Sequence, residues 1–300
     1  MDNYIKIHKM NFQKLGPVMG NINLYNEIIC TKLKQNLRNY DSVTVYFGGD
    51  VQDYPEVMSS HRDHGKYIQW NLLNMVSILS LKFPTSIVCV IKPKRIEFKT
   101  FSCYDNFVPS NNLGAPTYTE MHGSLSHLRN LLKNALSKLS ESADSCETKE
   151  NTCTNENDTE KSLNINLIGF SKGCVVLNQL ITEIYTLSQT QNEENDNMLQ
   201  FWRKIKSIYW LDGGHSGGKH TWITQRSILN NLATFPDLSI HVHVTPYQVR
   251  DERRPWIRTE CKSFVETLKR ANANISYKLH FEEETPSLEK HFEVLDAFTS

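Results

Sequence analysis

Long apolar runs are missing from this 300-residue sequence. No stretch approaches the roughly 20 apolar residues that a membrane-spanning helix needs, so we expect no transmembrane segment. Residues 1–10 carry Lys6 and Lys9 among mixed residues, are poor in arginine and lack the apolar core of a secretory signal. These absences indicate a soluble, intracellular protein.

An excess of charge of one sign is also missing. The 33 Lys and Arg residues balance the 33 Asp and Glu residues, which gives a formal net charge of zero. Binding to a nucleic acid relies on a basic field, and the chain has none overall. The arginines at residues 250–258 are interspersed with acids, which favours local ion pairs. We therefore do not expect nucleic acid as a partner.

Cysteines are few and follow no pattern. There are seven, an odd number with scattered spacing. Four of them lie in apolar or helical contexts that suit free, reduced thiols, namely Cys30, Cys89, Cys174 and Cys261. Cys146 and Cys153 share a polar segment, where they could pair but where nothing in the sequence indicates that they do. The chain is long enough to bury a large core without disulfides.

What the sequence does have is an alternation of short apolar strands and amphipathic helices from Ser42 onward. Helical spacing of apolar residues predicts helices at residues 125–139 and 288–298. Strands are predicted at residues 42–47, 86–91, 205–211, 239–244 and 275–281. This alternation is typical of a mainly parallel sheet with helices on both faces, so we predict a single α/β domain over residues 1–300.

Three segments stand apart from the alternation. Residues 140–161 are dominated by polar residues with no apolar period, and we predict a disordered insertion there. Residues 188–197 form a second polar insert. Near the start of the chain, residues 22–30 could form a short edge hairpin.

The most informative stretch is residues 163–173, with the sequence LNINLIGFSKG. Its first half alternates apolar residues with Asn and ends in a glycine, as a strand entering a tight turn does, and apolar positions at helical spacing follow. The motif G-x-S-x-G between strand and helix is typical of a nucleophile elbow, whose glycines keep a strained turn free of side chains. Ser171 is therefore the candidate nucleophile.

The order of a serine, acids beyond it and a histidine near the C-terminus resembles the α/β-hydrolase superfamily. More narrowly, the sequence is similar to the uncharacterised metazoan family typified by the human chromosome 2 open reading frame 69 product. The motifs that carry this resemblance are FGGDVQ at 47–52, GFSKGC at 169–174, YWLDGGHSGG at 209–218 and TPYQVRD at 245–251. It covers most of the chain from about Asp41 onward. It implies an α/β-hydrolase fold, a hydrolase-like protein with no established substrate, and a mitochondrial location, with the cytoplasm as the alternative.

The superfamily pattern also suggests roles for residues beyond Ser171. His291 opens the last predicted helix, near the usual place for the base that takes the serine proton. A carboxylate must hold that imidazole and stabilise its charged form. We favour Asp251, which follows the penultimate predicted strand, and keep Asp212, at the end of the strand before it, as the alternative acid.

A tetrahedral intermediate would also need an oxyanion hole. The backbone N–H of Lys172 comes with the elbow, and a second donor is expected from Gly48 or Gly49, where a strand runs into two glycines. Asp50 beside them carries a negative charge that would oppose an oxyanion, and we expect it to turn away and cap the next segment. Lys172 is unusual beside a nucleophile and could either pair with Asp50 or select an acidic acyl substrate.

Other polar patterns are interpreted as structural. His215 with His220, and His241 with His243, could each contribute to a metal site, but no cysteine or carboxylate completes a ligand set, so no metal is expected. The glycine-rich loop at 213–220 lacks the Ser or Thr of a phosphate-binding loop, so no nucleotide is expected. We expect no cofactor.

Two functions remain open at this stage. The first is a serine hydrolase that acts on a small-molecule ester, thioester or amide through an acyl-enzyme. The second is a catalytically silent hydrolase-fold protein that binds or regulates a protein partner. Residues 94–119 and 213–222 would build the lid and the acyl pocket, and their sequence does not define a substrate.

Overall fold

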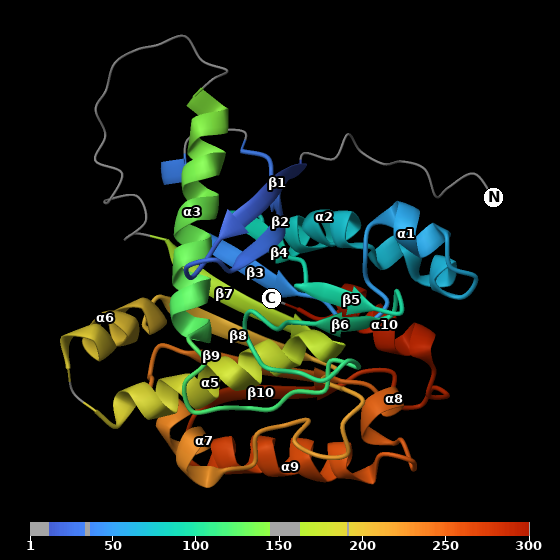
Figure 1. Ribbon diagram of the computed structural model, residues 1–300. Coiled ribbons are helices and arrows are strands. Elements are labelled where there is room, and N and C mark those ends of the chain that lie inside the picture. The colour runs from blue at the N-terminus through green and yellow to red at the C-terminus, as the bar shows by residue number, and fades with distance from the viewer. Residues whose placement is uncertain (1–11, 34–36, 145–162, 191, 300) are drawn as a thin grey trace.

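A computed structural model describes residues 12–33, 37–144, 163–190 and 192–299. Within these ranges eight strands form one sheet in the order β1-β2-β4-β3-β7-β8-β9-β10 (Figure 1). The pairs β1–β2 and β2–β4 are antiparallel, and all pairs from β4 to β10 are parallel. The bounds are β1 Phe12–Met19, β2 Tyr25–Thr31, β3 Ser42–Phe47, β4 Ser86–Ile91, β7 Asn164–Phe170, β8 Ile205–Leu211, β9 Ser239–Val244 and β10 Asn274–Leu279. A separate hairpin consists of β5 Arg95–Glu97 and β6 Phe101–Cys103.

Helices connect the parallel strands. The α-helices are α1 Pro55–Ser59, α2 Leu72–Lys82, α3 Ser124–Asp144, α5 Cys174–Ser188, α6 Glu193–Trp202, α7 Arg226–Leu232, α8 Pro246–Val249, α9 Pro255–Arg270 and α10 Leu288–Ala297. The described residues also contain the short 3-10 helices η1 Leu37–Asn39, η2 His64–Trp70 and η3 Ser171–Gly173. In the part of the chain that the structure describes, no helix has the length and apolar character needed to cross a membrane.

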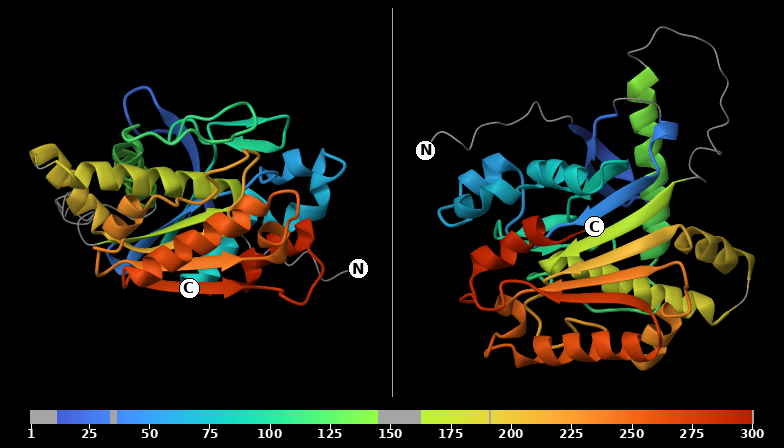
Figure 2. Two further views of the ribbon diagram at one scale, coloured as in Figure 1. Left: turned by 90° about the horizontal axis from the view of Figure 1, so that it is seen from below. Right: turned by 180° about the vertical axis from the view of Figure 1, so that it is seen from behind.

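The sheet separates two apolar cores because alternate strand residues point to opposite faces. Val45 and Phe47 of β3 pack into the core formed with α3, α5, α7 and α9, whereas Tyr46 between them packs into the core formed with α2 and α10. Figure 1 looks onto the first of these faces and the right-hand view of Figure 2 onto the second. A mainly parallel sheet covered in this way, with an elbow after a central strand, is the α/β-hydrolase fold that the resemblance implied.

Most predicted elements are present at or near their predicted bounds. The strands at 42–47, 86–91, 205–211 and 239–244 are confirmed, and the last strand is one to two residues displaced, at 274–279. The edge hairpin exists, but its first strand was placed wrongly: it is β1 at Phe12–Met19, and residues 20–24 are its turn. Gly16 and Pro17 hide this strand, because they break the alternation at the point where the pairing shifts between Leu15 and Val18.

The two polar segments contain more helix than we expected. α3 runs on to Asp144, and the rest of the 140–161 insertion, with Cys146 and Cys153, lies outside the described residues. In the 188–197 segment, α6 begins at Glu193, where the Asn192 side chain accepts a hydrogen bond from the Asn195 N–H. This N-cap and the acids in the first turn favour a helix start, and buried apolar residues later in α6 anchor it. The cysteines at 30, 89, 103, 174 and 261 are free thiols.

Candidate active site

The candidate nucleophile lies at the end of a central strand. β7 pairs with β3 on one side and β8 on the other (Figure 1). Ser171 directly follows the last residue of β7. Ser171 has φ 50°, in the left-handed region that residues other than glycine seldom adopt. Helices η3 and α5 follow at once. The G-x-S-x-G motif therefore has the strand-turn-helix context of a nucleophile elbow.

The two glycines of the motif allow this turn to pack closely against neighbouring backbone atoms. A Cβ atom on Gly169 would lie 2.9 Å from the backbone N of Cys174, and one on Gly173 would overlap the carbonyl oxygen of Phe47. Backbone atoms cannot move aside as the end of a flexible side chain can, so larger residues would be expected to distort the elbow. The elbow is thus packed directly against the end of β3, where the candidate oxyanion loop begins.

His291 lies beside the elbow, in the first turn of α10. Its ring packs on that of Phe170, with the centroids 4.6 Å apart, and the residue is 3% exposed. Its Nδ1 lies 2.6 Å from Oδ2 of Asp212, which leaves Nε2 as the nitrogen that can act as a base. Among the described residues the Ser171 hydroxyl has no hydrogen-bond partner. The bond between Ser171 and His291 that a triad requires is therefore not made in this conformation.

Asp212 follows the last residue of β8 and is fully buried. Its Oδ1 accepts the backbone N–H of Thr245 at 2.7 Å, and its Oδ2 accepts the Thr245 hydroxyl at 2.5 Å. Its backbone has φ 47°, again in the left-handed region. Held by Thr245 and bonded to His291, this carboxylate fixes the orientation of the imidazole and is placed to stabilise its protonated form.

Asp251 lies elsewhere, contrary to the sequence-based preference. Its Oδ2 accepts from Nε of Arg254 at 2.7 Å, and its Oδ1 accepts from the backbone N–H of Arg253 at 2.8 Å. The short helix α8 separates it from the end of β9, so it reaches the start of α9 instead of the edge of the sheet. The structure thus brings His291 together with Asp212, the alternative acid, and not with Asp251.

The loop after β3 touches the nucleophile, and one of its two expected donors, Gly49, is already hydrogen-bonded within the loop. A Cβ atom on Gly49 would lie 2.7 Å from the Cβ of Ser171, so the two residues are in close contact. The Gly49 N–H, however, donates to Oε1 of Gln52 at 2.8 Å and is not available to an oxyanion. The backbone N–H of Asp50 has no hydrogen-bond partner among the described residues. Of these two backbone N–H groups, only that of Asp50 is without a hydrogen bond within the described part of the chain.

Lys172 pairs with Asp50, which was one of its two predicted roles. The Lys172 side chain is completely buried, and its Nζ lies 3.2 Å from Oδ2 of Asp50 and donates to the carbonyl oxygen of Leu113 at 2.6 Å. Desolvation raises the pKa of Asp50 above its ordinary value, and the Lys172 ammonium partly offsets this rise. Because the ammonium is buried and already bound, it is poorly placed to select an acidic substrate.

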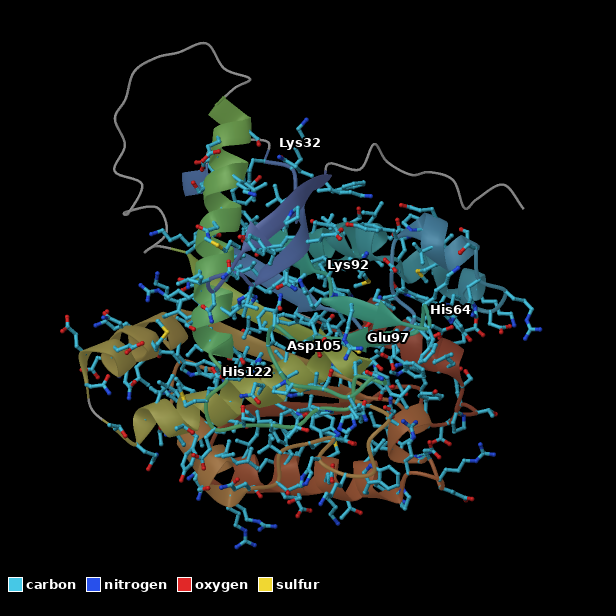
Figure 3. All side chains as sticks on the ribbon, viewed as in Figure 1. Lys32, His64, Lys92, Glu97, Asp105 and His122 are labelled. Carbon is cyan, nitrogen blue, oxygen red and sulfur yellow. The ribbon has the colours of Figure 1, made fainter. Side chains whose placement is uncertain are left out.

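A hairpin within the predicted lid segment, residues 94–119, is fastened to the oxyanion loop. Ser102 of β6 donates its N–H to Oδ1 of Asp50 at 2.9 Å and its hydroxyl to the Gly49 carbonyl at 2.8 Å. At the base of the hairpin, Arg95 pairs with Asp105 at 2.6 Å and Glu97 at 2.7 Å, the two carboxylates labelled in Figure 3. The predicted lid segment therefore carries an ordered hairpin that is bonded to the loop after β3.

The histidine pairs make local hydrogen bonds. His215 accepts from the Gly217 N–H through Nδ1 and contacts the His220 carbonyl through Nε2, and burial lowers its pKa to about 4. His243 bonds His280 instead of His241, with 2.8 Å between the ring nitrogens. Among the described residues, no three His, Cys, Asp or Glu side chains form a group that could hold a metal ion.

Gln52 and Thr245 hold residues of the site, and neither was among the site residues predicted from the sequence. Gln52 is the last residue of the FGGDVQ motif, and it bridges Gly49, the Tyr46 hydroxyl and the Trp70 carbonyl. The motif gave no physical reason to expect this bridge. Thr245 could have been found, because it follows β9 and the carboxyl ends of neighbouring parallel strands lie at one edge of the sheet.

Comparison with known proteins finds a family and similar folds. The family model described as C2orf69 matches residues 14–162 and 139–274. The mouse mitochondrial protein C2orf69 homolog is 40% identical over 287 residues, which cover 85% of this chain and 77% of that protein. The human mitochondrial protein C2orf69 is 40% identical over 288 residues, which cover 85% and 73%.

Several solved structures that this chain resembles are described as esterases. A carboxylesterase from Bacillus cereus has a TM-score of 0.42 and 13% identity, with 92% of this chain and 95% of that chain covered. The esterase Est22 with p-nitrophenol has a TM-score of 0.47 and 11% identity, with 96% and 77% covered. At such identities these likenesses concern the fold alone.

Proposed function

This chain belongs to the C2orf69 family, and from the site at the end of its central strand we propose that it is a serine hydrolase. The substrate would be a small-molecule ester, thioester or amide. Ser171, His291 and Asp212 would form the triad, and an acyl group would be carried on Ser171 between the two half-reactions.

The reaction follows from the groups present. The Ser171 oxygen attacks the substrate carbonyl carbon while Nε2 of His291 takes its proton. The carbonyl oxygen becomes an oxyanion, and the intermediate collapses as the leaving group departs with the proton from His291. A water molecule then repeats these steps on the acyl-enzyme and releases the acid. Asp212 stabilises the imidazolium in both halves.

One observation carries the proposal: a buried histidine–carboxylate pair lies beside a serine held at φ 50°. An imidazole bonded at Nδ1 to a buried carboxylate is oriented as a general base requires. The missing bond between Ser171 and His291 does not count against this role, because catalytic hydrogen bonds are often long or poorly aligned before substrate binds.

The oxyanion hole would use two backbone donors. The Lys172 N–H follows the nucleophile, where the elbow geometry directs it towards the reacting carbonyl. The second donor would be the Asp50 N–H, because the Gly49 N–H already donates a hydrogen bond to the Gln52 side chain. Gly48 and Gly49 would then serve chiefly to let the loop approach Ser171 closely.

A fluorophosphonate probe tests the proposal directly, because it labels only an activated serine. The wild-type protein should be labelled, and Ser171→Ala should not. Ser137→Ala, at an exposed position on α3, is the matched control and should be labelled like the wild type. A wild-type protein that unfolds cooperatively on heating yet takes up no probe would contradict the proposal.

A second candidate is a catalytically silent protein that binds a partner. The Gly49 N–H favours it, because this expected oxyanion donor is already bonded to Gln52. This candidate predicts no labelling and no turnover of p-nitrophenyl esters, together with normal folding of Ser171→Ala.

The names of the mouse and human relatives suggest the compartment. Both are called mitochondrial proteins, so we propose that this chain also acts in the mitochondrion. Fractionation of cells that express the full chain should recover it with mitochondrial markers and protect it from added protease until the organelle is lysed.

A further inference from the structure

The side chains of Lys172 and Asp50 join the nucleophile elbow to the loop after β3. The Lys172 side chain has no exposed surface, and its Nζ lies 3.2 Å from Oδ2 of Asp50. Each partner is held from a second side: Lys172 donates to the Leu113 carbonyl at 2.6 Å, and Asp50 accepts from the Ser102 N–H at 2.9 Å. These bonds therefore fix the orientation of both side chains as well as the distance between the ammonium and the carboxylate.

The backbones of the same two residues carry the donors of the proposed oxyanion hole. Stabilisation of an oxyanion depends on donors that already stand at the right separation before the reaction. The Lys172 N–H belongs to the elbow and the Asp50 N–H to another loop, so their separation depends on how the two segments are held. Gly49 contacts Ser171 closely, but its own N–H is bonded to Gln52.

A buried ammonium is not needed to fill the space beside the elbow. Removing an ammonium and a carboxylate from water is costly, and an apolar side chain of similar volume often serves stability as well or better. An ion pair differs from an apolar contact in fixing the distance between two particular atoms. Here those atoms belong to the two residues whose backbone positions matter for the oxyanion.

We propose that the Lys172–Asp50 ion pair is a positioning device that sets the separation of the two oxyanion donors. The inference rests on the proposed hydrolase function. The oxyanion exists only in the transition state and the intermediate, so loss of the pair lowers kcat and leaves KM nearly unchanged. A pair that only stabilised the fold would affect thermal unfolding and leave kcat of the folded protein intact.

The test compares Lys172→Met, Asp50→Asn and the double variant with p-nitrophenyl butyrate as substrate. Asp50→Asn leaves the buried Lys172 ammonium without its carboxylate, and Lys172→Met leaves the partly exposed Asp50 carboxylate without its cation, so either single variant can fail to fold. The double variant removes both charges and keeps the side-chain volumes, so it remains informative. The matched control is Lys206→Met with Asp237→Asn, a pair that is also 3.2 Å apart but lies on the surface.

We expect the double variant to unfold cooperatively, to keep KM within about twofold and to lose kcat by about 100-fold, as removal of one oxyanion donor does. Any single variant that folds should lose about as much as the double variant, because either change breaks the same link. The control pair should keep wild-type kcat.

Two other outcomes would each decide the matter. A folded double variant with wild-type kcat would overturn the positioning role while leaving the hydrolase proposal intact. A folded wild type that neither hydrolyses the ester nor takes up a fluorophosphonate would overturn the hydrolase proposal and this inference together.

Discussion

His291 and Asp212 are 79 residues apart in the sequence, yet Nδ1 of the histidine lies 2.6 Å from Oδ2 of the aspartate. The pair is buried where the end of β8 meets the first turn of α10. Thr245, from the end of the neighbouring strand β9, holds the same carboxylate with its backbone N–H and its hydroxyl. Three elements thus fix one imidazole beside the elbow.

The two candidate acids can be separated by a matched pair of variants. Asp212→Asn should lower kcat for an ester substrate by about 10⁴-fold, because an amide cannot stabilise the imidazolium and favours the wrong tautomer. Asp251→Asn loses only a partly exposed ion pair with Arg254 and should change kcat by less than about threefold. Equal losses in both variants, or a larger loss in Asp251→Asn, would contradict the assignment of Asp212.

The elbow should tolerate no side chain at Gly173. In Gly173→Ala the new Cβ would overlap the Phe47 carbonyl, and we expect about 3 kcal/mol or more of lost stability, or failure to fold. Gly218→Ala is the control, because a Cβ there meets no atom within 4 Å, and its unfolding free energy should stay within about 0.5 kcal/mol of the wild type. Urea denaturation measures both, and a wild-type midpoint for Gly173→Ala would refute the packing described.

Glu183 should be a large contributor to stability. It is buried in α5 and accepts backbone N–H groups of His122, Ser124 and Leu125 at the start of α3, each at 2.9 Å. Glu183→Ala leaves these donors without a partner and should cost about 3 kcal/mol or more in denaturant unfolding.

The control for Glu183 is Glu266→Ala on α9. Glu266 pairs with Arg270 and Lys262 on the surface, where such pairs contribute about 0.5 kcal/mol or less. If both variants lost the same small amount, the capping role of Glu183 would be wrong.

Stability should fall on mild acidification. Burial lowers the pKa of His127, His215 and His280 to about 4 and that of His243 to about 3. Between these values and the ordinary pKa near 6.5, the unfolded chain binds more protons than the folded one, so the free energy of unfolding decreases as pH drops from about 6.5 to about 4. Each histidine contributes up to about 1.4 kcal/mol per pH unit in that range. Urea denaturation midpoints at pH 7, 6 and 5 measure how the free energy of unfolding changes with pH. Equal midpoints at the three pH values would contradict the lowered pKa of these buried histidines.

Much of the architecture could be predicted because it depends on local patterns. β-branched and aromatic runs located β3, β4, β8 and β9, since strands buried on both faces are apolar without interruption. The elbow at Ser171 was predictable for a similar reason: a strained turn with helix packed against strand requires glycine at two set positions. Where glycine and proline interrupt a real strand, as in β1, the local pattern was misleading.

Which of the two aspartates lies against His291 could not be predicted in this way. Asp212 and Asp251 both follow parallel strands, and spacing along the chain does not say which carboxylate turns towards α10. Arg254, three residues beyond Asp251, binds that carboxylate, whereas Thr245 holds Asp212 from the adjacent strand. Similarly, the bond from Gly49 to Gln52 joins a backbone donor to a side chain whose rotamer depends on Tyr46 and Trp70.

The sequence by itself determined the fold class, the order of the central strands along the chain and the serine at the elbow, because hydrophobic periodicity and glycine requirements act over a few residues. Only the tertiary structure decided which aspartate contacts His291 and which backbone N–H of the loop after β3 is already hydrogen-bonded. It also decided that Lys172 forms an ion pair with Asp50. Each of these depends on hydrogen bonds and ion pairs between residues distant in the chain, and their partners are chosen by packing.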